Sequence, residues 1–210
     1  MRDTIMIVIV LTVVCVISAL SLGVVNNITA DRIAEQRQKA KLKAIISALP
    51  RDRVRYDNDP SVDIVKIPEW KERDGTTKEI YLGKEKGKIV GLAFTSYSQG
   101  YNGLITIMMG IDPNGKLVGI EIIDHLETPG LGSRIESPEL FKNQFYRKSI
   151  EGSDNGELVV VKGRKADKNW EIEALTGATI SSSGVTQAVN DGLAKFHQYK
   201  DQILNSDQQD

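Results

Sequence analysis

The sequence is poor in cysteine and histidine, and this shortage limits the chemistry that its side chains can perform. The single cysteine, Cys15, lies inside an apolar N-terminal run, so the rest of the chain can form no disulfide, thiolate metal site or cysteine nucleophile. The two histidines, His125 and His197, are far apart in the chain, and we expect no zinc or other metal site. His125 alone is typical of a loop or core residue.

The sequence also lacks an excess of either charge and has few aromatic side chains. Its 210 residues carry a formal net charge of −1, and aromatic residues make up 6 % of them. Proteins that bind nucleic acid usually present a strong basic field, so we expect no nucleic-acid partner. The length beyond the apolar run is that of one ordinary domain, which can bury a core without disulfides.

One long apolar run is present, at residues 5–25, and no charge interrupts it. About twenty apolar residues match one membrane crossing. A cleaved signal peptide is the alternative, but the run is longer than its usual apolar region and no Ala-x-Ala pattern follows directly. We therefore predict a retained transmembrane anchor at residues 1–28. Its N-terminus would be cytoplasmic, and the large following domain would lie on the outer, periplasmic side of the inner membrane.

The anchor is predicted to continue into a membrane-proximal helix over residues 29–50, which Pro50 ends. Residues 51–79 are polar and irregular in pattern. One domain over residues 51–205 and a flexible tail at 206–210 complete the chain. The apolar positions expected in the membrane-proximal helix are Ile33, Leu42, Ile45, Ile46 and Leu49.

The domain itself reads as strand-rich α+β and is closed by a C-terminal helix. The motif Asp112-Pro113-Asn114-Gly115 is a strong hairpin signal, and Ser137-Pro138 predicts the start of a short helix. The predicted strands are 79–82, 89–97, 104–111, 116–123, 158–162 and 170–174. The apolar positions of the C-terminal helix are Val185, Ala188, Val189, Gly192, Leu193, Phe196, Tyr199 and Ile203.

The chain is organised around the segment at residues 173–185, which carries five hydroxyl side chains in front of the C-terminal helix. Gly177 and Ala178 permit a sharp turn. Ser181, Ser182 and Ser183 are N-cap candidates, which would place Thr179 just upstream of a helix N-terminus that favours an anion. An ordinary turn followed by a capped helix explains the same residues. The segment matches neither a P-loop nor a nucleophile elbow.

Two further glycine-containing segments are ambiguous by themselves. Gly130-Leu131-Gly132, in the loop at 127–132, allows close backbone approach to a ligand but lacks the third glycine of a dinucleotide fingerprint. Gly100-Tyr101-Asn102-Gly103 reads as a turn.

Together these segments resemble a known family. Four features occur in a fixed order along the chain: an anchor, Gly-Tyr-Asn-Gly at 100–103, Glu-Thr-Pro-Gly-Leu-Gly at 127–132 and Thr-Gly-Ala-Thr-Ile-Ser-Ser at 176–182. The arrangement is similar to the FMN-binding domain of the G subunit of the Rnf ion-translocating ferredoxin:NAD⁺ oxidoreductase. The C subunit of the sodium-pumping NADH:quinone oxidoreductase is a close relative of that protein. The resemblance covers essentially the whole chain, and its compact length favours the Rnf family.

The resemblance implies that FMN is joined through its phosphate to Thr179, and that a flavin transferase using FAD and magnesium makes this phosphoester. Glu173 stands where the family commonly has Asp. No side chain of this protein would act as a catalyst for turnover. The residues expected around the cofactor are Thr176, Gly177, Ala178, Ser181 and Ser182 in the first motif, and Glu127, Thr128, Gly130, Leu131 and Gly132 in the second.

The function implied is an electron-transfer subunit that relays electrons within a membrane redox complex, in contact with its other subunits and with membrane lipid. Three alternatives stay open from the sequence. They are a component like the C subunit of the sodium-pumping enzyme, a self-contained flavin reductase of the cell surface, and a non-redox anchored binding domain.

Overall fold

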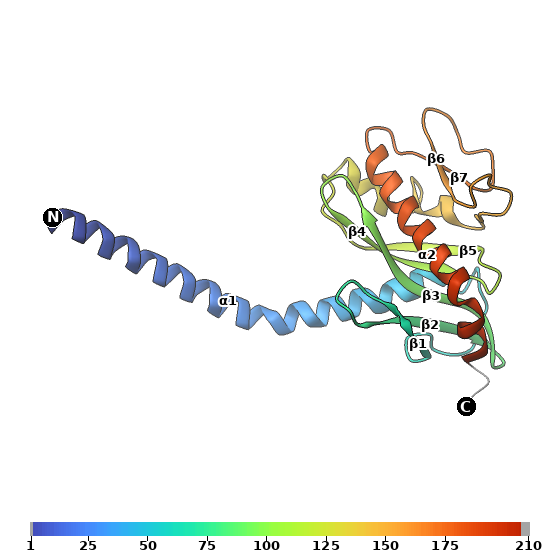
Figure 1. Cartoon of the computed structure of the whole chain (residues 1–210), viewed down its shortest axis with the longest axis horizontal. Coiled ribbons are helices and arrows are strands. Elements are labelled where there is room, and N and C mark those ends of the chain that lie inside the picture. The colour runs from blue at the N-terminus through green and yellow to red at the C-terminus, as the bar shows by residue number, and fades with distance from the viewer. Residues whose placement is uncertain (1, 207–210) are drawn as a thin grey trace. The chain divides into compact units, whose positions relative to one another are not determined.

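The structure, a computed structural model, describes residues 2–206, so residues 207–210 of the predicted tail lie outside the described part. The chain forms two compact units, Met1–Lys41 and Leu42–Asp210. Helix α1 (Arg2–Ala48) runs through the first unit and ends in the second (Figure 1). Its apolar part is long enough to cross a membrane, and none of that part is buried in the protein. The predicted anchor and membrane-proximal helix therefore form one continuous helix.

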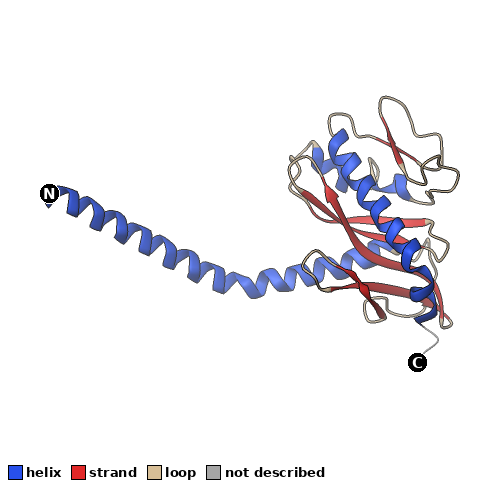
Figure 2. Ribbon diagram, in the orientation of Figure 1, coloured by secondary structure: helices blue, strands red, loops and turns tan. Residues whose placement is uncertain are grey.

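The second unit is built on an antiparallel sheet (Figure 2). Its five strands follow each other in chain order. The predicted hairpin turn at 112–115 joins neighbouring strands, as does a turn at 85–88. The turn at 100–103 joins two more strands, and in it the Gly100 amide donates to the Gly103 carbonyl at 2.7 Å. The α+β prediction is confirmed. The strands are β1 (Ile64–Lys71), β2 (Thr77–Glu85), β3 (Lys88–Gln99), β4 (Leu104–Ile111) and β5 (Leu117–Asp124).

Helix α2 (Thr179–Asn205) covers one face of this sheet. All eight apolar positions predicted for it are buried. The contact is close: a Cβ on Gly192 would lie 2.2 Å from the sulfur of Met109 in β4. Polar contact accompanies it, since the Ser96 hydroxyl of β3 donates to the Ala188 carbonyl at 2.6 Å. Burial of this apolar helix face is what holds α2, and hence its first turn, in place.

The last turns of α1 pack against the opposite face of the sheet. Ile45 and Leu49 are buried there, as predicted, whereas Ile33, Leu42 and Ile46 are exposed. The backbones approach so closely that a Cβ on Gly110 would lie 2.0 Å from the Ala48 carbonyl oxygen. Glycine at this position in β4 is therefore required for the helix end to reach the sheet.

Three local predictions were wrong, and β1 is the first. Residues 51–79 were expected to be irregular, yet they contain this edge strand. A bulge between Lys66 and Lys71 breaks the register, so the buried residues Ile67 and Trp70 are three apart and the two-residue alternation is lost. Pro68 is tolerated because an edge strand leaves one set of amides unpaired.

The second error concerns the short helix expected from Ser137. The segment makes a single turn, in which the Ser137 carbonyl accepts from the amides of Phe141 and Lys142, both at 3.0 Å. It then continues as the 3₁₀ helix η2 (Lys142–Phe145), which follows η1 (Gly132–Glu136). This path places Phe141 and Phe145 in the core, with ring centroids 5.4 Å apart.

The third error concerns the start of the C-terminal helix, which lies at Thr179 rather than after the serines. The strands β6 (Val159–Val161) and β7 (Glu171–Glu173) precede it and pair in parallel as a separate two-stranded sheet. Because β7 ends a few residues before Thr179, this small sheet fixes the path by which the chain enters α2.

Candidate functional site

A pocket of about 480 Å³ lies at the N-terminus of α2. Three segments that are distant in sequence form it: the β3–β4 turn, the loop after β5 and the first turn of α2. This volume is within the range of small-molecule sites. Its lining residues are Tyr101, Glu127, Thr128, Leu131, Gly132, Gly177, Ala178, Thr179, Ile180 and Ser181.

A tight turn leads into the helix at this pocket. The Ala178 amide donates to the Leu175 carbonyl at 2.9 Å, and Gly177 has φ of +81°. A Cβ on Gly177 would lie 3.0 Å from Leu131 Cδ1. Glycine is thus needed here both for its left-handed backbone and for the approach of the neighbouring loop. Thr176 is exposed and lies outside the pocket lining.

Thr179 is the first residue of α2, and no side chain caps this helix at its N-cap residue, Ala178. The first amide to bond within the helix is that of Ser182, which donates to the Ala178 carbonyl at 3.0 Å. The amides of residues 179–181 therefore have no carbonyl of the helix to bond. They and the helix dipole favour a negative charge beside the half-buried Thr179.

The serines do not cap the helix, contrary to the sequence prediction. The Ser182 hydroxyl donates to the Ala178 carbonyl at 2.9 Å and accepts from the Leu175 amide at 3.0 Å, so it fastens the preceding turn. Ser183 is exposed. Ser181 points instead to Glu127, and its hydroxyl donates to Oε2 of that carboxylate. A cap residue must lie outside the helix, and these three residues lie inside it.

Glu127 joins the three segments of the pocket. Its side chain is 4 % exposed, and Oε1 accepts from the amides of Tyr101 and Asn102 at 2.8 and 3.1 Å. With the bond from Ser181, the carboxylate therefore holds the β3–β4 turn and the first turn of α2 against its own loop. No space remains for a side chain at Gly132, where a Cβ would lie 2.8 Å from Glu127 Oε2.

The other residues of the loop after β5 differ in their relation to the pocket. Thr128 lines it and accepts from the Asn102 side-chain amide at 3.1 Å. Gly130 lies outside the lining and has φ of +74°, and nothing would meet a Cβ built there. Gly130 therefore serves the backbone path of the loop, and close approach inside the pocket occurs at Gly132.

An apolar rim borders the pocket. Tyr101, Leu131 and Ile180 are 65 %, 44 % and 55 % exposed, although all three are large apolar or aromatic residues. Neither Tyr101 nor Ile180 was predicted at the site from the sequence. Tyr101 lies in the glycine-flanked turn at 100–103, and Ile180 follows Thr179 directly, so both were adjacent to recognised motifs. Exposed apolar groups around a pocket are typical of a site for a flat, partly apolar ligand.

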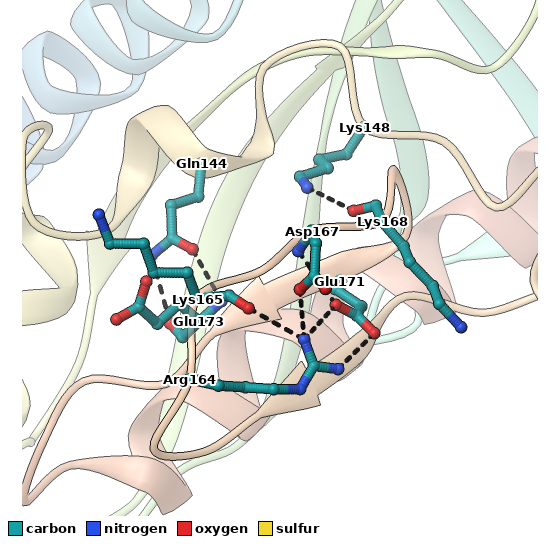
Figure 3. Close-up of polar contacts among 8 residues, drawn as sticks. All are labelled: Gln144, Lys148, Arg164, Lys165, Asp167, Lys168, Glu171 and Glu173. Carbon is teal, nitrogen blue, oxygen red and sulfur yellow. Dashed lines mark hydrogen bonds and ion pairs between the residues drawn. The ribbon is translucent and has the colours of Figure 1, made fainter.

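A polar cluster supports the chain just before the pocket (Figure 3). The Gln144 side chain donates to the Glu173 carbonyl at 3.2 Å and accepts from the Glu173 amide at 2.7 Å. Close by, Arg164 binds the carboxylate of Glu171 through two bonds of 2.6 and 2.7 Å. Hydrogen bonds from the Arg164 guanidinium lower the pKa of Glu171 to about 2. The side chain of Glu173 is exposed.

Arg164→Gln is expected to lower stability at neutral pH and to make stability less sensitive to acid. The depressed pKa of Glu171 means that its ion pair stabilises the fold above the ordinary value of 4.5, and that this contribution is lost as the pH falls towards 2. Urea midpoints of the detergent-solubilised chain should therefore differ most at pH 7, and the difference should shrink below pH 4.5. Asp167→Asn, in an exposed pair with Arg164, is the control and should have a smaller effect. A constant difference across this range would contradict the assignment.

Comparison with known proteins agrees with this geometry. The model of the FMN-binding domain matches residues 100–194, which hold all three segments of the pocket. A second model, the RnfG N-terminal region, matches residues 8–46 within α1. The chain is thus a membrane protein with an FMN-binding domain.

Relatives that match this chain over most of their length identify the family. The chain is 35 % identical over 184 residues to the G subunit of the Na⁺-translocating ferredoxin:NAD⁺ oxidoreductase complex of Acetobacterium woodii, and the match covers 86 % of each chain. It is 31 % identical over 183 residues to the G subunit of the proton-translocating complex of Clostridium ljungdahlii, with 87 % of this chain and 86 % of that one covered. The chain belongs to the RnfG family, the G subunits of ion-translocating oxidoreductase complexes, as its motifs predicted.

Solved structures share the fold. The C subunit of the Na⁺-translocating NADH-quinone reductase of Parabacteroides distasonis aligns with a TM-score of 0.58 at 18 % identity, over 80 % of this chain and 96 % of that chain. NqrC of Shewanella oneidensis aligns with a TM-score of 0.54 at 21 % identity, over 75 % of this chain and 71 % of that chain. These similarities establish a common architecture, whereas the sequence relationship is to RnfG.

Proposed function

We propose that this chain is the electron-transferring G subunit of a membrane-bound ferredoxin:NAD⁺ oxidoreductase complex, and that it carries FMN joined through its phosphate to Thr179. Family membership and the FMN-binding domain support the role in electron transfer. The observation that carries the attachment site is the position of Thr179, which lines the pocket as the first residue of an uncapped helix.

The pocket fits FMN in two respects. A phosphodiester keeps one negative charge, which the first turn of α2 can stabilise by roughly 0.3–1 kcal/mol. The apolar rim of Tyr101, Leu131 and Ile180 offers contact to a flat aromatic ring. Among the described residues that line the pocket, Glu127 alone is charged, and its carboxylate is engaged by three donors.

The protein supplies placement, while the bound flavin supplies the redox chemistry. Thr179 is a tether that keeps the cofactor on the protein. Glu127 binds the β3–β4 turn and the first turn of α2 and so holds both against the loop after β5. The apolar rim and Thr179 therefore line the same pocket. The exposure of this rim leaves the cofactor accessible to redox partners in the complex.

Attachment requires a flavin transferase as a partner during maturation. In this reaction the Thr179 hydroxyl forms a bond to the FMN phosphate of FAD, the phosphoanhydride bond breaks, and AMP leaves with the hydroxyl proton. Exposed Thr176 and Gly177 make the turn accessible to such an enzyme, and the Glu173 carboxylate is exposed on the strand that leads into it.

The membrane helix is proposed to be a retained anchor in contact with lipid, with the N-terminus in the cytoplasm and the domain from about Asp31 onward outside. Protease added to intact spheroplasts should digest the domain, and protection of the domain would reverse the orientation.

The mass of the native protein tests the attachment directly. Produced together with its flavin transferase, the chain should gain the mass of one FMN less one water, and it should show flavin fluorescence in a denaturing gel. A colourless chain without this added mass would exclude covalent FMN and favour a non-redox binding domain.

A further inference from the structure

The pocket that Thr179 lines is called the flavin pocket below. A second pocket, of about 640 Å³, lies at the other end of β5. Leu117 and Val118 at the start of β5 line it, whereas Glu127 follows the end of that strand. An eight-residue strand is about 25 Å long at the usual rise per residue. The two pockets share no lining residue, so a ligand of one leaves the other free.

Four cationic side chains from three separate segments line this pocket, and we call it the basic pocket. They are Arg53, Arg55, Lys116 and Arg147. Two carboxylates, Glu85 and Asp112, also line it. Asp112 is engaged by the hairpin turn, because its Oδ1 accepts from the amides of Asn114 and Lys116 at 2.9 and 2.8 Å.

Neutral groups hold two of the three guanidinium groups of the basic pocket in position. Arg53 donates to the Val118 carbonyl and to the Asn143 side chain, both at 3.1 Å, and its Cζ lies 4.3 Å from the centroid of the Tyr146 ring. Arg147 Cζ lies 5.2 Å from the same centroid. Stacking on an aromatic ring orients a guanidinium without neutralising its charge.

The backbone also holds Arg147 in an unusual conformation. Its φ is +62°, in the left-handed region that glycine adopts more readily. The Arg147 amide donates to the Leu117 carbonyl at 2.8 Å, and the Leu117 amide donates to the Lys148 carbonyl at 3.0 Å. These bonds to β5 maintain the turn that places Arg147 in the pocket lining. A glycine at this position would be less strained.

Positive charge in the basic pocket is not balanced. Among the described residues 2–206, none of its four cationic side chains forms an ion pair with a carboxylate. Arg55, Lys116 and Arg147 are exposed, so their charges are available at the surface. Its lining carries four cationic side chains and two carboxylates and is therefore net positive, and a concave surface with an excess of one charge attracts the opposite charge.

We propose that the basic pocket binds an acidic segment, rich in aspartate or glutamate, of another protein of the complex. The proposal rests on the proposed function, which makes the chain part of a multi-subunit assembly. Guanidinium groups recognise carboxylates through paired hydrogen bonds. Docking at this end of β5 would hold the domain in the complex and leave the flavin pocket exposed to its electron-transfer partners.

Charge reversal of the three exposed residues tests the proposal in the full chain. One variant combines Arg55→Glu, Lys116→Glu and Arg147→Glu, and it is produced together with the other subunits. The matched control is Lys162→Glu, Lys165→Glu and Lys195→Glu, which changes the net charge equally at exposed positions outside the basic pocket. Binding to the complex, purified through a tag on another subunit, should fall at least about tenfold in the first variant and remain unchanged in the control. Covalent flavin should be present in both, which shows that both fold.

A zero-length carbodiimide cross-link identifies the partner. Lys116 should form an amide with an aspartate or glutamate of another subunit, and Lys116→Arg should keep binding while losing this product, because it keeps the charge and lacks the amine. The proposal is overturned if the charge-reversed variant is retained like the control, or if Lys116 links only to acids of its own chain. Failure of the wild-type chain to co-purify with any subunit would instead contradict the proposed function.

Discussion

Thr179→Ala is expected to abolish covalent FMN completely. The phosphoester requires a hydroxyl, and alanine removes the one at the first residue of α2. Ser181 cannot replace it, because its buried hydroxyl is bound to Glu127, and Ser182 is fully buried with both of its bonds inside the preceding turn. A denaturing gel viewed for flavin fluorescence and the intact mass of the purified chain both report the result.

The variant should still fold. Thr179 has no hydrogen bond from its side chain among the described contacts, and alanine is favoured inside a helix. The change in the free energy of unfolding should therefore stay within about 0.5 kcal/mol. An unchanged urea midpoint would show that loss of flavin comes from the missing hydroxyl rather than from unfolding.

Thr176→Ala is the matched control, since it removes a threonine hydroxyl from the same motif. Thr176 is exposed and lies outside the pocket lining, so this variant should keep at least part of its covalent flavin. Flavin fluorescence that survives denaturation in Thr179→Ala would assign the attachment to another residue and refute this part of the proposal.

Glu127→Ala should be the most destabilising single change at the site. It leaves the buried hydroxyl of Ser181 and the partly buried amides of Tyr101 and Asn102 without their acceptor. An unsatisfied buried group costs about 1–3 kcal/mol and a partly exposed one costs less, so the loss for the three groups together should be about 2–4 kcal/mol. Because the three segments are no longer joined, covalent loading of FMN should fall as well. Urea unfolding and flavin content of the co-produced protein measure the two effects.

Glu127→Gln and Ser181→Ala separate shape from charge. A glutamine oxygen can accept from both amides while its NH₂ group donates to Ser181, so this variant should lose only about 1–2 kcal/mol through weaker neutral hydrogen bonds. Ser181→Ala removes one of the three bonds and should cost about 1 kcal/mol. Equal stability of Glu127→Ala and the wild type would show that the carboxylate does not hold the segments together.

Features with a short-range signal were predicted correctly from the sequence. The apolar run at 5–25 has the length of a membrane crossing, and the eight apolar positions of α2 follow the helical period. The Asp-Pro-Asn-Gly hairpin depends on turn residues that are adjacent in the chain. Predictions failed where a tertiary feature overrides the local sequence pattern. A bulge in β1 removes the two-residue alternation by which a strand is recognised, and burial of Phe141 and Phe145 accompanies 3₁₀ turns in place of a short helix.

The helix start illustrates the same limit at the site. Three consecutive serines favour an N-cap by their chemistry, yet α2 begins at Thr179. Ser181 binds Glu127, which is 54 residues earlier in the chain, and Ser182 closes the turn from Leu175. Local propensity contains no information about such a partner, so the hydroxyl motif was evident but the role of each hydroxyl was not.

The sequence by itself therefore determined the apolar N-terminal helix, the α+β class, the family and the segment that holds Thr179, because each depends on composition or on residues that are neighbours in the chain. Only the tertiary structure decided that Tyr101, Glu127 and Ser181 meet at one pocket, and that Arg53, Lys116 and Arg147 meet at another. These groupings arise because packing of α2 and of the α1 end on opposite faces of the sheet brings distant segments together. The physical forces responsible, burial of apolar surface and pairing of buried polar groups, act across space rather than along the chain.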